Sequence, residues 1–149
     1  MLLCLLTVSL LSAHSQQGLR INALFEGKIV PSEKMVETRV RGKSISKYKL
    51  SFFRSVRFKA DDQTFRQIDH LASQDFVDES NKFKGRSPYS SGTMRIVNKK
   101  KTFTQMYELA PHNTTNRYLC YKQAGDIVTV IYMEGTLSSP EELEKLLKD

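Results

Sequence analysis

The sequence predicts a mainly β domain, either a barrel or a strongly curved sheet, with one helix packed on its side. Three observations support this class. Strand-like segments alternate between apolar and polar residues, short turns join them, and a helix-forming segment stands at the C-terminal end. The length of 149 residues and the 40% share of hydrophobic residues suit a single domain with one core.

Short polar connections separate the strand-like segments in the second half of the chain. Residues 93–97 and 102–109 flank the polar stretch 98–101, and residues 117–122 and 127–133 flank residues 123–126. Connections of this length are typical of β-hairpins, so we expect two hairpins here.

One helix is clearly indicated, and a second segment leaves two alternatives open. Residues 140–148 begin with Ser139 as N-cap and Pro140 in the first turn, and leucines at 143, 146 and 147 form one apolar stripe. In residues 62–71, Phe65, Ile68 and Leu71 fit a helical stripe, but a strand after a turn also fits.

The N-terminal residues 1–15 form an apolar stretch of the length expected for a signal peptide. The small residues Ala13 and Ser15 predict cleavage after Ser15, which makes residues 16–149 a secreted, extracellular domain. Cys120 is then the one cysteine left, so the mature chain has no internal disulfide. Asn113 begins an Asn-Thr-Thr sequence and is therefore a candidate glycosylation site of a glycoprotein.

The net charge of +7 is concentrated in residues 16–60, which hold eleven basic and three acidic residues. If residues 36–59 form one long strand with a bulge near Phe53 and Arg54, the odd-numbered basic side chains share a face opposite the apolar ones. That face is either a solvated exterior or a surface for an acidic glycan, a receptor or a membrane. The basic residues concerned are Arg39, Arg41, Lys43, Lys47, Lys49, Arg57 and Lys59.

Two kinds of partner are not expected. The basic set lacks the stacking aromatic residues that nucleic acid requires, and no apolar segment reaches the roughly 20 residues of a transmembrane helix.

From Phe83 onward the sequence resembles the lipocalin (calycin) family, especially the tear lipocalin and odorant-binding group. The resemblance rests on the aromatic-rich Arg117-Tyr118-Leu119-Cys120-Tyr121-Lys122, the short hairpin after it, and a last strand followed by a Leu- and Glu-rich helix. It implies an eight-stranded antiparallel up-and-down barrel that transports a small hydrophobic ligand such as an odorant, pheromone, fatty acid or retinoid. The family's first-strand tryptophan is missing, because Gly27-Lys28-Ile29 stands in its place, and its disulfide cannot form.

In such a barrel, inward-facing apolar residues would line the ligand cavity, or would fill the interior without leaving a cavity. The predicted ligand-binding residues are Tyr48, Leu50, Phe52, Val56, Phe58, Phe103, Tyr107, Tyr118 and Cys120.

Catalytic and metal-binding patterns are weak. The mature chain has two histidines, His70 and His112, and a Cys120–His112 nucleophile pair would lack a third orienting group. Cys120 is better interpreted as a small buried apolar residue, and the histidines show no metal-ligand spacing. We therefore expect a protein that is not an enzyme and has no cofactor and no metal. It would be a secreted carrier, monomer or weak dimer, or alternatively a secreted interaction protein that uses the basic strand face.

Overall fold

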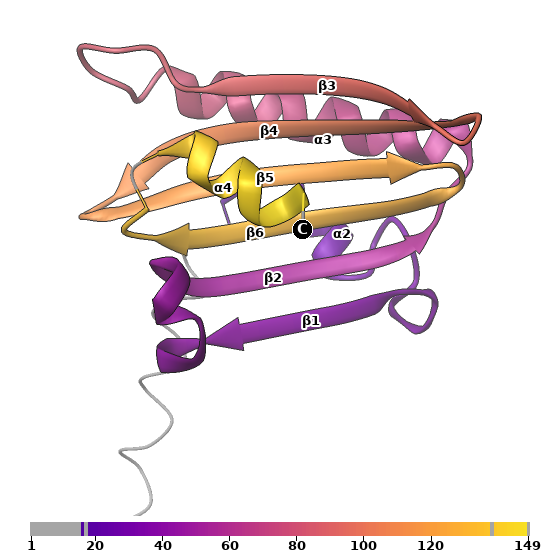
Figure 1. The fold of residues 1–149 in the computed structure, drawn as a ribbon, viewed down its shortest axis with the longest axis horizontal. Helices are drawn as coiled ribbons and strands as arrows, with labels where there is room; N and C mark the ends of the chain where they lie inside the picture. Colours follow the sequence, from indigo (N-terminus) through magenta and orange to yellow (C-terminus); the bar gives the residue numbers. More distant parts are fainter. Residues whose placement is uncertain (1–15, 17, 138, 149) are drawn as a thin grey trace, which may run out of the picture.

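The computed structural model describes residues 16, 18–137 and 139–148, and of residues 146–148 only the backbone. These residues form a six-stranded antiparallel sheet with helices on both faces (Figure 1). Its elements are α2 (Asn22–Phe25), the 3-10 helix η1 (Ser32–Lys34), β1 (Val36–Arg41), the 3-10 helix η2 (Gly42–Tyr48), β2 (Leu50–Lys59), α3 (Asp62–Ser80), β3 (Ser90–Val97), β4 (Lys100–His112), β5 (Thr115–Ala124), β6 (Ile127–Gly135) and α4 (Pro140–Lys148).

The strand order is β1-β2-β6-β5-β4-β3, so β1 and β3 form the two edges of the sheet. The expected eight-stranded closed barrel is wrong, although the mainly β class with a C-terminal helix is correct. A barrel needs its first and last strands to pair. Here α3 takes the chain from β2 to the opposite edge, and β2 pairs with β6 while β1 and β3 stay apart (Figure 1).

Both predicted hairpins form, and a third joins β4 to β5. The left-handed conformation that such tight turns need is adopted by Asn98 and Lys99 between β3 and β4, by Asn113 between β4 and β5, and by Gly125 between β5 and β6. The four strands β3 to β6 therefore follow one another as a meander.

The ambiguous segment after residue 61 is a helix, and it is longer than the predicted stripe. The Asp61 carboxylate accepts a hydrogen bond from the backbone N–H of Thr64 at 2.7 Å and caps the first turn of α3. Ile68, Ala72, Asp75 and Glu79 follow at helical spacing and are buried against the sheet. Asp75 and Glu79 are polar, so the apolar stripe of residues 62–71 does not extend over the C-terminal part of α3.

Two cores lie on the two faces of the sheet. On the α3 face, α3 and residues 18–30 pack against Phe52, Val56, Tyr107, Tyr121 and Tyr132, together with further apolar residues of the same strands. Figure 1 shows α3 and α2 behind the sheet and α4 in front of it. Each face therefore has its own helical cover, and the sheet is the middle one of three layers rather than the wall of a hollow barrel.

The smaller core lies under α4, which begins at the predicted residue. The backbone N–H of Glu142 donates to the Ser139 hydroxyl at 3.4 Å, and Leu143 is completely buried. Leu143 packs with Leu50, Tyr118, Cys120 and Met133, among others, on this second face. The side chains of Leu146 and Leu147 lie outside the described ones, as do the predicted signal peptide and its cleavage point.

Residues 36–59 do not form the single long strand expected from their alternation. Lys49 adopts a left-handed conformation after η2, and its carbonyl oxygen accepts a hydrogen bond from Thr136. Gly135 packs so closely against this carbonyl that a Cβ atom there would collide with it. The pairing of β2 with β6 is irregular at the same place, between Leu50 and Phe52. This irregularity sets Leu50 and Phe52 in different cores.

None of the helices in the described part of the chain has the length and apolar character needed to cross a membrane.

Candidate ligand groove beside the C-terminal helix

A groove of about 510 Å³ lies on the α4 face of the sheet, beside the helix. Side chains of β3, β4, β5 and β6 form its floor and walls, and Glu144 of α4 contributes one side. The groove exists because α4 covers only part of this face. The rest of the face therefore presents the outward side chains of four neighbouring strands to solvent.

A row of polar side chains crosses the sheet through this groove. Thr93 lies opposite Thr104, Thr104 opposite Lys122, Lys122 opposite Thr129, and Thr129 opposite Arg57. Directly opposed residues of antiparallel strands project on the same side of the sheet. The register therefore places hydroxyl groups and two cationic side chains next to one another.

The row nearer to α4 is apolar. Met106 lies opposite Cys120, which lies opposite Ile131, and all three line the groove. Met106 and Cys120 are each 2% exposed, so these side chains are part of the α4-side core as well as the groove floor. A molecule in the groove would contact an apolar floor on one side and hydroxyl groups on the other.

The charge at the rim is mostly positive. Arg95, opposite Thr102, and Lys122 both line the groove and are exposed. On the neighbouring strand β2, Arg57 and Lys59 are exposed on the same face. Glu144 also lines the groove, and its carboxylate accepts a hydrogen bond from the Tyr89 hydroxyl at 2.7 Å.

The chemistry of Cys120 does not suit nucleophilic catalysis. Burial raises the pKa of its thiol to about 12, so the thiol is protonated at neutral pH. His112 is exposed at the far end of β4, where it pairs with Thr115, whereas Cys120 pairs with Met106. The considered Cys120–His112 pair is therefore not formed. Within the described residues, no three His, Cys, Asp or Glu side chains gather as a metal site would require.

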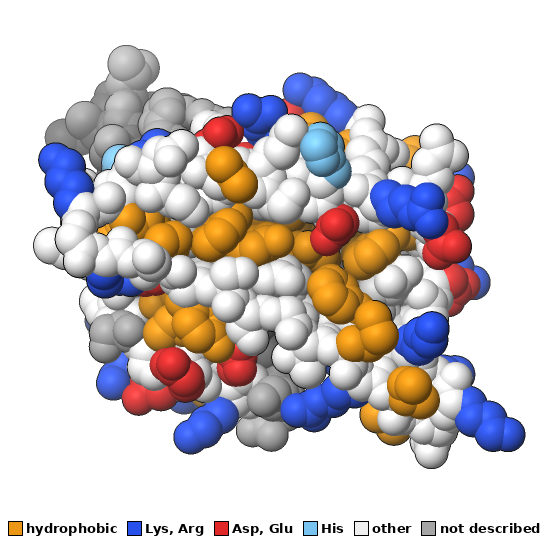
Figure 2. All heavy atoms as spheres, turned by 90° about the horizontal axis from the view of Figure 1, so that it is seen from above, with side chains coloured by type: hydrophobic (Ala, Val, Ile, Leu, Met, Phe, Trp, Pro, Cys, Tyr) orange, Lys and Arg blue, Asp and Glu red, His pale blue; other side chains and the backbone are white. Residues whose placement is uncertain are grey.

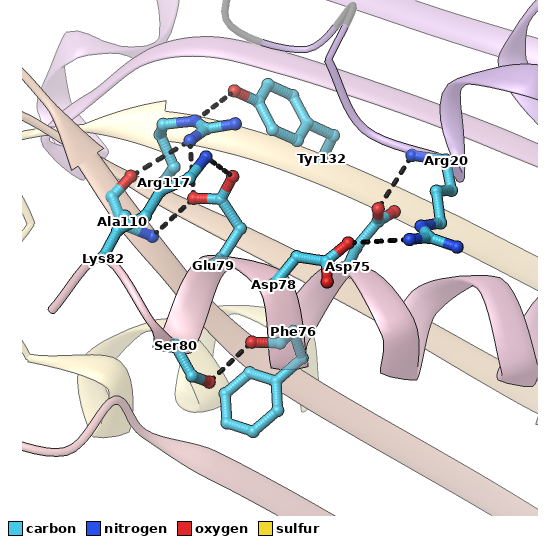
Figure 3. A network of polar contacts seen from close by, with 10 residues as sticks. All are labelled: Arg20, Asp75, Phe76, Asp78, Glu79, Ser80, Lys82, Ala110, Arg117 and Tyr132. Carbon is cyan, nitrogen blue, oxygen red and sulfur yellow. Dashed lines mark hydrogen bonds and ion pairs between the residues drawn. The ribbon is translucent and has the colours of Figure 1, made fainter.

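The opposite face of the sheet carries a buried polar network instead (Figure 3). Arg117 of β5 donates to the Glu79 carboxylate at 3.1 Å, to the Ala110 carbonyl oxygen at 3.0 Å and to the Tyr132 hydroxyl at 3.1 Å. Burial disfavours the arginine charge, but Tyr132 and the carboxylates of Glu79 and Glu134 raise the pKa of Arg117 overall. Arg117 therefore stays charged and joins α3 to β4, β5 and β6.

A second carboxylate of α3 holds the N-terminal part of the domain. One oxygen of Asp75 accepts a hydrogen bond from the backbone N–H of Arg20 at 2.8 Å (Figure 3). The other accepts one from the backbone N–H of Ile21 at 2.9 Å. Burial raises the pKa of Asp75, and the two backbone hydrogen bonds work against this rise. The network joins α3 to the sheet and to the N-terminal part of the domain, so we assign it a structural role.

Comparison with known proteins places the chain in a family but not in a functional class. Residues 8–147 match the family described as "Family of unknown function (DUF6108)". The chain belongs to this family. No curated protein matches the sequence. A crystal structure of a Pseudomonas aeruginosa protein of unknown function is 11% identical, with 76% of each chain covered and a TM-score of 0.34.

In this DUF6108 protein, the predicted ligand-binding residues are divided between the two faces of the sheet. Phe52, Val56, Phe58, Phe103 and Tyr107 lie on the α3 face, whereas Leu50, Tyr118 and Cys120 lie in the core under α4. Tyr48 is 40% exposed in η2. The nine residues therefore do not surround one cavity, because a flat sheet separates the sides that a barrel would have joined. Of the nine, Cys120 lines the groove.

The basic residues are exposed but do not share one face. Arg41 lies opposite Phe52 and is placed over its ring, with the guanidinium carbon 4.8 Å from the ring centroid. Arg39 projects on the same side, opposite Arg54. Arg57 and Lys59 project on the α4 face, and Lys43, Lys47 and Lys49 lie in η2 or next to it. The single basic stripe is therefore wrong, since η2 separates two strands of different phase.

Asn113, the predicted glycosylation site, is exposed in the turn between β4 and β5. Its glycosylation stays a prediction.

Sequence analysis missed most residues of the groove. Ser91, Thr93 and Arg95, and likewise Thr102 and Thr104, recur with a period of two. A face of hydroxyl and basic residues at this spacing is the sequence signal for the groove, and apolar alternation does not include it.

Proposed function

We propose that this protein is a non-enzymatic carrier that binds a small amphipathic acid, such as a fatty acid, in the groove beside α4. The observation that carries the proposal is one groove with an apolar floor of Met106, Cys120 and Ile131 and a cationic rim of Arg95 and Lys122. The proposal keeps the ligand class expected from the sequence but moves the site from a barrel interior to an open sheet face.

Size and chemistry both support this ligand class. A volume of about 510 Å³ lies within the roughly 300–1,000 Å³ typical of small-molecule sites, which are mostly apolar with a few placed polar groups. The apolar part of the ligand would cover Met106 and Ile131. Its carboxylate would accept hydrogen bonds from Lys122 and from the hydroxyls of Thr104 and Thr129, which lie directly beside that lysine.

The test is displacement of a fluorescent fatty acid, with one variant for each part of the site. Thr104→Trp would fill the groove from a half-buried position, and Lys122→Glu would reverse the charge at the rim. We expect both to weaken binding by about tenfold or more, a loss near 1.4 kcal/mol. Lys43→Glu is the matched control, because it makes the same charge change in η2, away from the groove. Absence of saturable binding by the parent protein would reject the proposal.

The arrangement of charge on the α4 face favours a second candidate function, the binding of an acidic glycan. Arg57 and Lys59 of β2, Arg95 of β3 and Lys122 of β5 lie on this face, and Thr129 separates Lys122 from Arg57 in one row. Such a surface attracts a polyanion over a longer distance than a small groove does.

Heparin chromatography distinguishes glycan binding on the α4 face from attraction by the net positive charge of the whole protein. The pair Arg57→Glu and Lys59→Glu should lower the salt concentration of elution more than the pair Lys43→Glu and Lys47→Glu, although both change the net charge equally. Equal shifts would show that only net charge matters.

A further inference from the structure

The β3 edge of the sheet is exposed and has few features that would prevent pairing with another strand. Among the described strands, β3 pairs with β4 alone, and its eight residue pairs from Ser90 to Val97 run without a register shift. All β3 residues except Ser91 are exposed. Edge strands are usually protected by bulges, prolines or charges, because their free backbone groups can pair with another chain. Arg95 is the one charged residue in this strand.

The other edge of the sheet, β1, carries more charged side chains than β3. In β1, Glu37, Arg39 and Arg41 are charged, and Arg39 and Arg54 form ion pairs with Glu37 at 3.1 and 2.8 Å. This edge has the charged side chains that discourage strand pairing. Val36 is its exposed apolar residue, at 69%.

The two sides of β3 have different chemistry. Met94 and Ile96 project on the α3 face, where they are 66% and 68% exposed, and Met94 lies opposite Phe103. Figure 2, which looks onto the molecule from the β3 side of Figure 1, shows hydrophobic side chains gathered in a band. Arg95 projects on the other face, toward the side on which Lys122 lies. An added strand would therefore meet Met94 and Ile96 on one side, and Arg95 between Thr93 and Val97 on the other.

A second copy of the chain does not suit this edge. Residues 90–101 contain four basic and no acidic residues, and three of the lysines stand at the β3–β4 turn. Antiparallel pairing of two β3 strands would bring two basic segments together without adding a carboxylate. Like charges placed close together across strands are destabilising.

We propose that the β3 edge binds an extended acidic peptide, which adds to the sheet as a further strand and alternates apolar with acidic residues. Its backbone would pair with the free edge of β3, as in known recognition by strand addition. Its apolar side chains would cover Met94 and Ile96, and its carboxylates would face Arg95 and Lys100, which lies opposite Val97. This site shares Arg95 with the proposed groove, but Met94 and Ile96 project on the opposite face, so substitutions of these two residues test it separately.

The experiment measures binding of a fluorescein-labelled eight-residue peptide of alternating valine and glutamate by anisotropy, using the full chain. We expect saturable binding that becomes about tenfold weaker in the double variant Met94→Ser and Ile96→Ser, and weaker again with Arg95→Glu. Both serine positions are more than half exposed, so the variant should fold. Val36→Ser on the other edge is the matched control and should bind like the parent protein.

Two further measurements make the result specific to strand addition. The same peptide with alternate amides N-methylated should not bind, and bound peptide should slow hydrogen exchange of residues 90–97. Binding that Met94→Ser and Ile96→Ser leave unchanged would overturn the proposal, and so would sedimentation showing a dimer of this chain that the double variant abolishes. Fatty-acid displacement should be unaffected by this double variant, which keeps the two proposals separable.

Discussion

Arg117 of β5 and Glu79 of α3 form a 3.1 Å ion pair in which both side chains are at most 7% exposed. Glu79 also accepts a hydrogen bond from the backbone N–H of Ala110 at 3.0 Å. The pair thus connects the helix to the sheet through two buried side chains. Removal of one charge would leave the other buried without its main partner.

We expect Glu79→Gln to lower the free energy of unfolding by about 3 kcal/mol, since breaking a buried ion pair costs roughly 3–5 kcal/mol. Urea denaturation gives the value. The exposed pair of Arg20 and Asp78, also 3.1 Å apart, is the control. Asp78→Asn should cost less than about 1 kcal/mol. Equal losses in the two variants would contradict the structural role assigned to Glu79.

Glu108 should make stability depend on pH in the acid range. Burial acts to raise its pKa, but hydrogen bonds from Arg86 and from the backbone N–H of Tyr89 lower it below its usual value of 4.5. A carboxylate whose pKa is lower in the folded state stabilises the fold above its unfolded pKa. This stabilisation is lost as the pH falls through the folded value.

Glu108→Gln should therefore reduce the free energy of unfolding by roughly 1.5 kcal/mol at pH 7, the lower end of the range for hydrogen bonds to a charged group. The difference from the parent protein should shrink below pH 4.5, the usual value for glutamate. Thermal unfolding between pH 3 and 7 measures it. Glu33→Gln, at an exposed position in η1, should show no such trend. A difference that stays constant with pH would argue against this account.

Asp75 should control how firmly residues 18–30 are attached to the sheet. Asp75→Ala removes both acceptors for the N–H groups of Arg20 and Ile21 and should cost about 2 kcal/mol. Because Ile21, Leu24 and Phe25 cover the core on the α3 face, we expect faster hydrogen exchange in this segment before global unfolding. Gln74→Ala removes an exposed contact to the Arg20 side chain and is the control. Unchanged exchange in Asp75→Ala would refute the tethering role.

Cys120 should react slowly with thiol reagents in the folded protein. Burial leaves it 2% exposed and raises its pKa to about 12, so both access and the thiolate form are limited. Labelling with peptide mass mapping should show modification of Cys120 mainly in urea. Thr93→Cys, in the same groove but exposed, should label rapidly without urea. Rapid labelling of Cys120 in the native state would mean that the groove floor opens.

Local patterns predicted most elements but not how they assemble. Ser139 and Pro140 gave the start of α4, and the alternation around Tyr118 and Tyr132 was that of real strands. Alternation indicates that a strand has one apolar and one polar side. This is true of strands in a barrel and of strands in a sheet covered by helices. Closure depends on which distant strands pair, such as β2 with β6, and this information is not local in the sequence.

The candidate site was less predictable for the same reason. Thr104, Lys122 and Thr129 are far apart in sequence and become neighbours only through the pairing of three strands. Strand alternation predicts that the basic residues share one face, because alternation alone does not indicate that η2 interrupts the strand. Arg41 therefore projects over Phe52, a residue from which strict alternation would separate it.

The position of β2 between β1 and β6 also determines the order in which the sheet can be completed. The β1–β2 hairpin is synthesised early, but its neighbour β6 is synthesised close to the C-terminal end. Until then, Phe52, Val56 and Phe58 have no β6 beside them. Contacts between such distant segments slow folding and prolong exposure of apolar surface. A nascent chain that stalls before residue 127 would therefore be expected to require a chaperone.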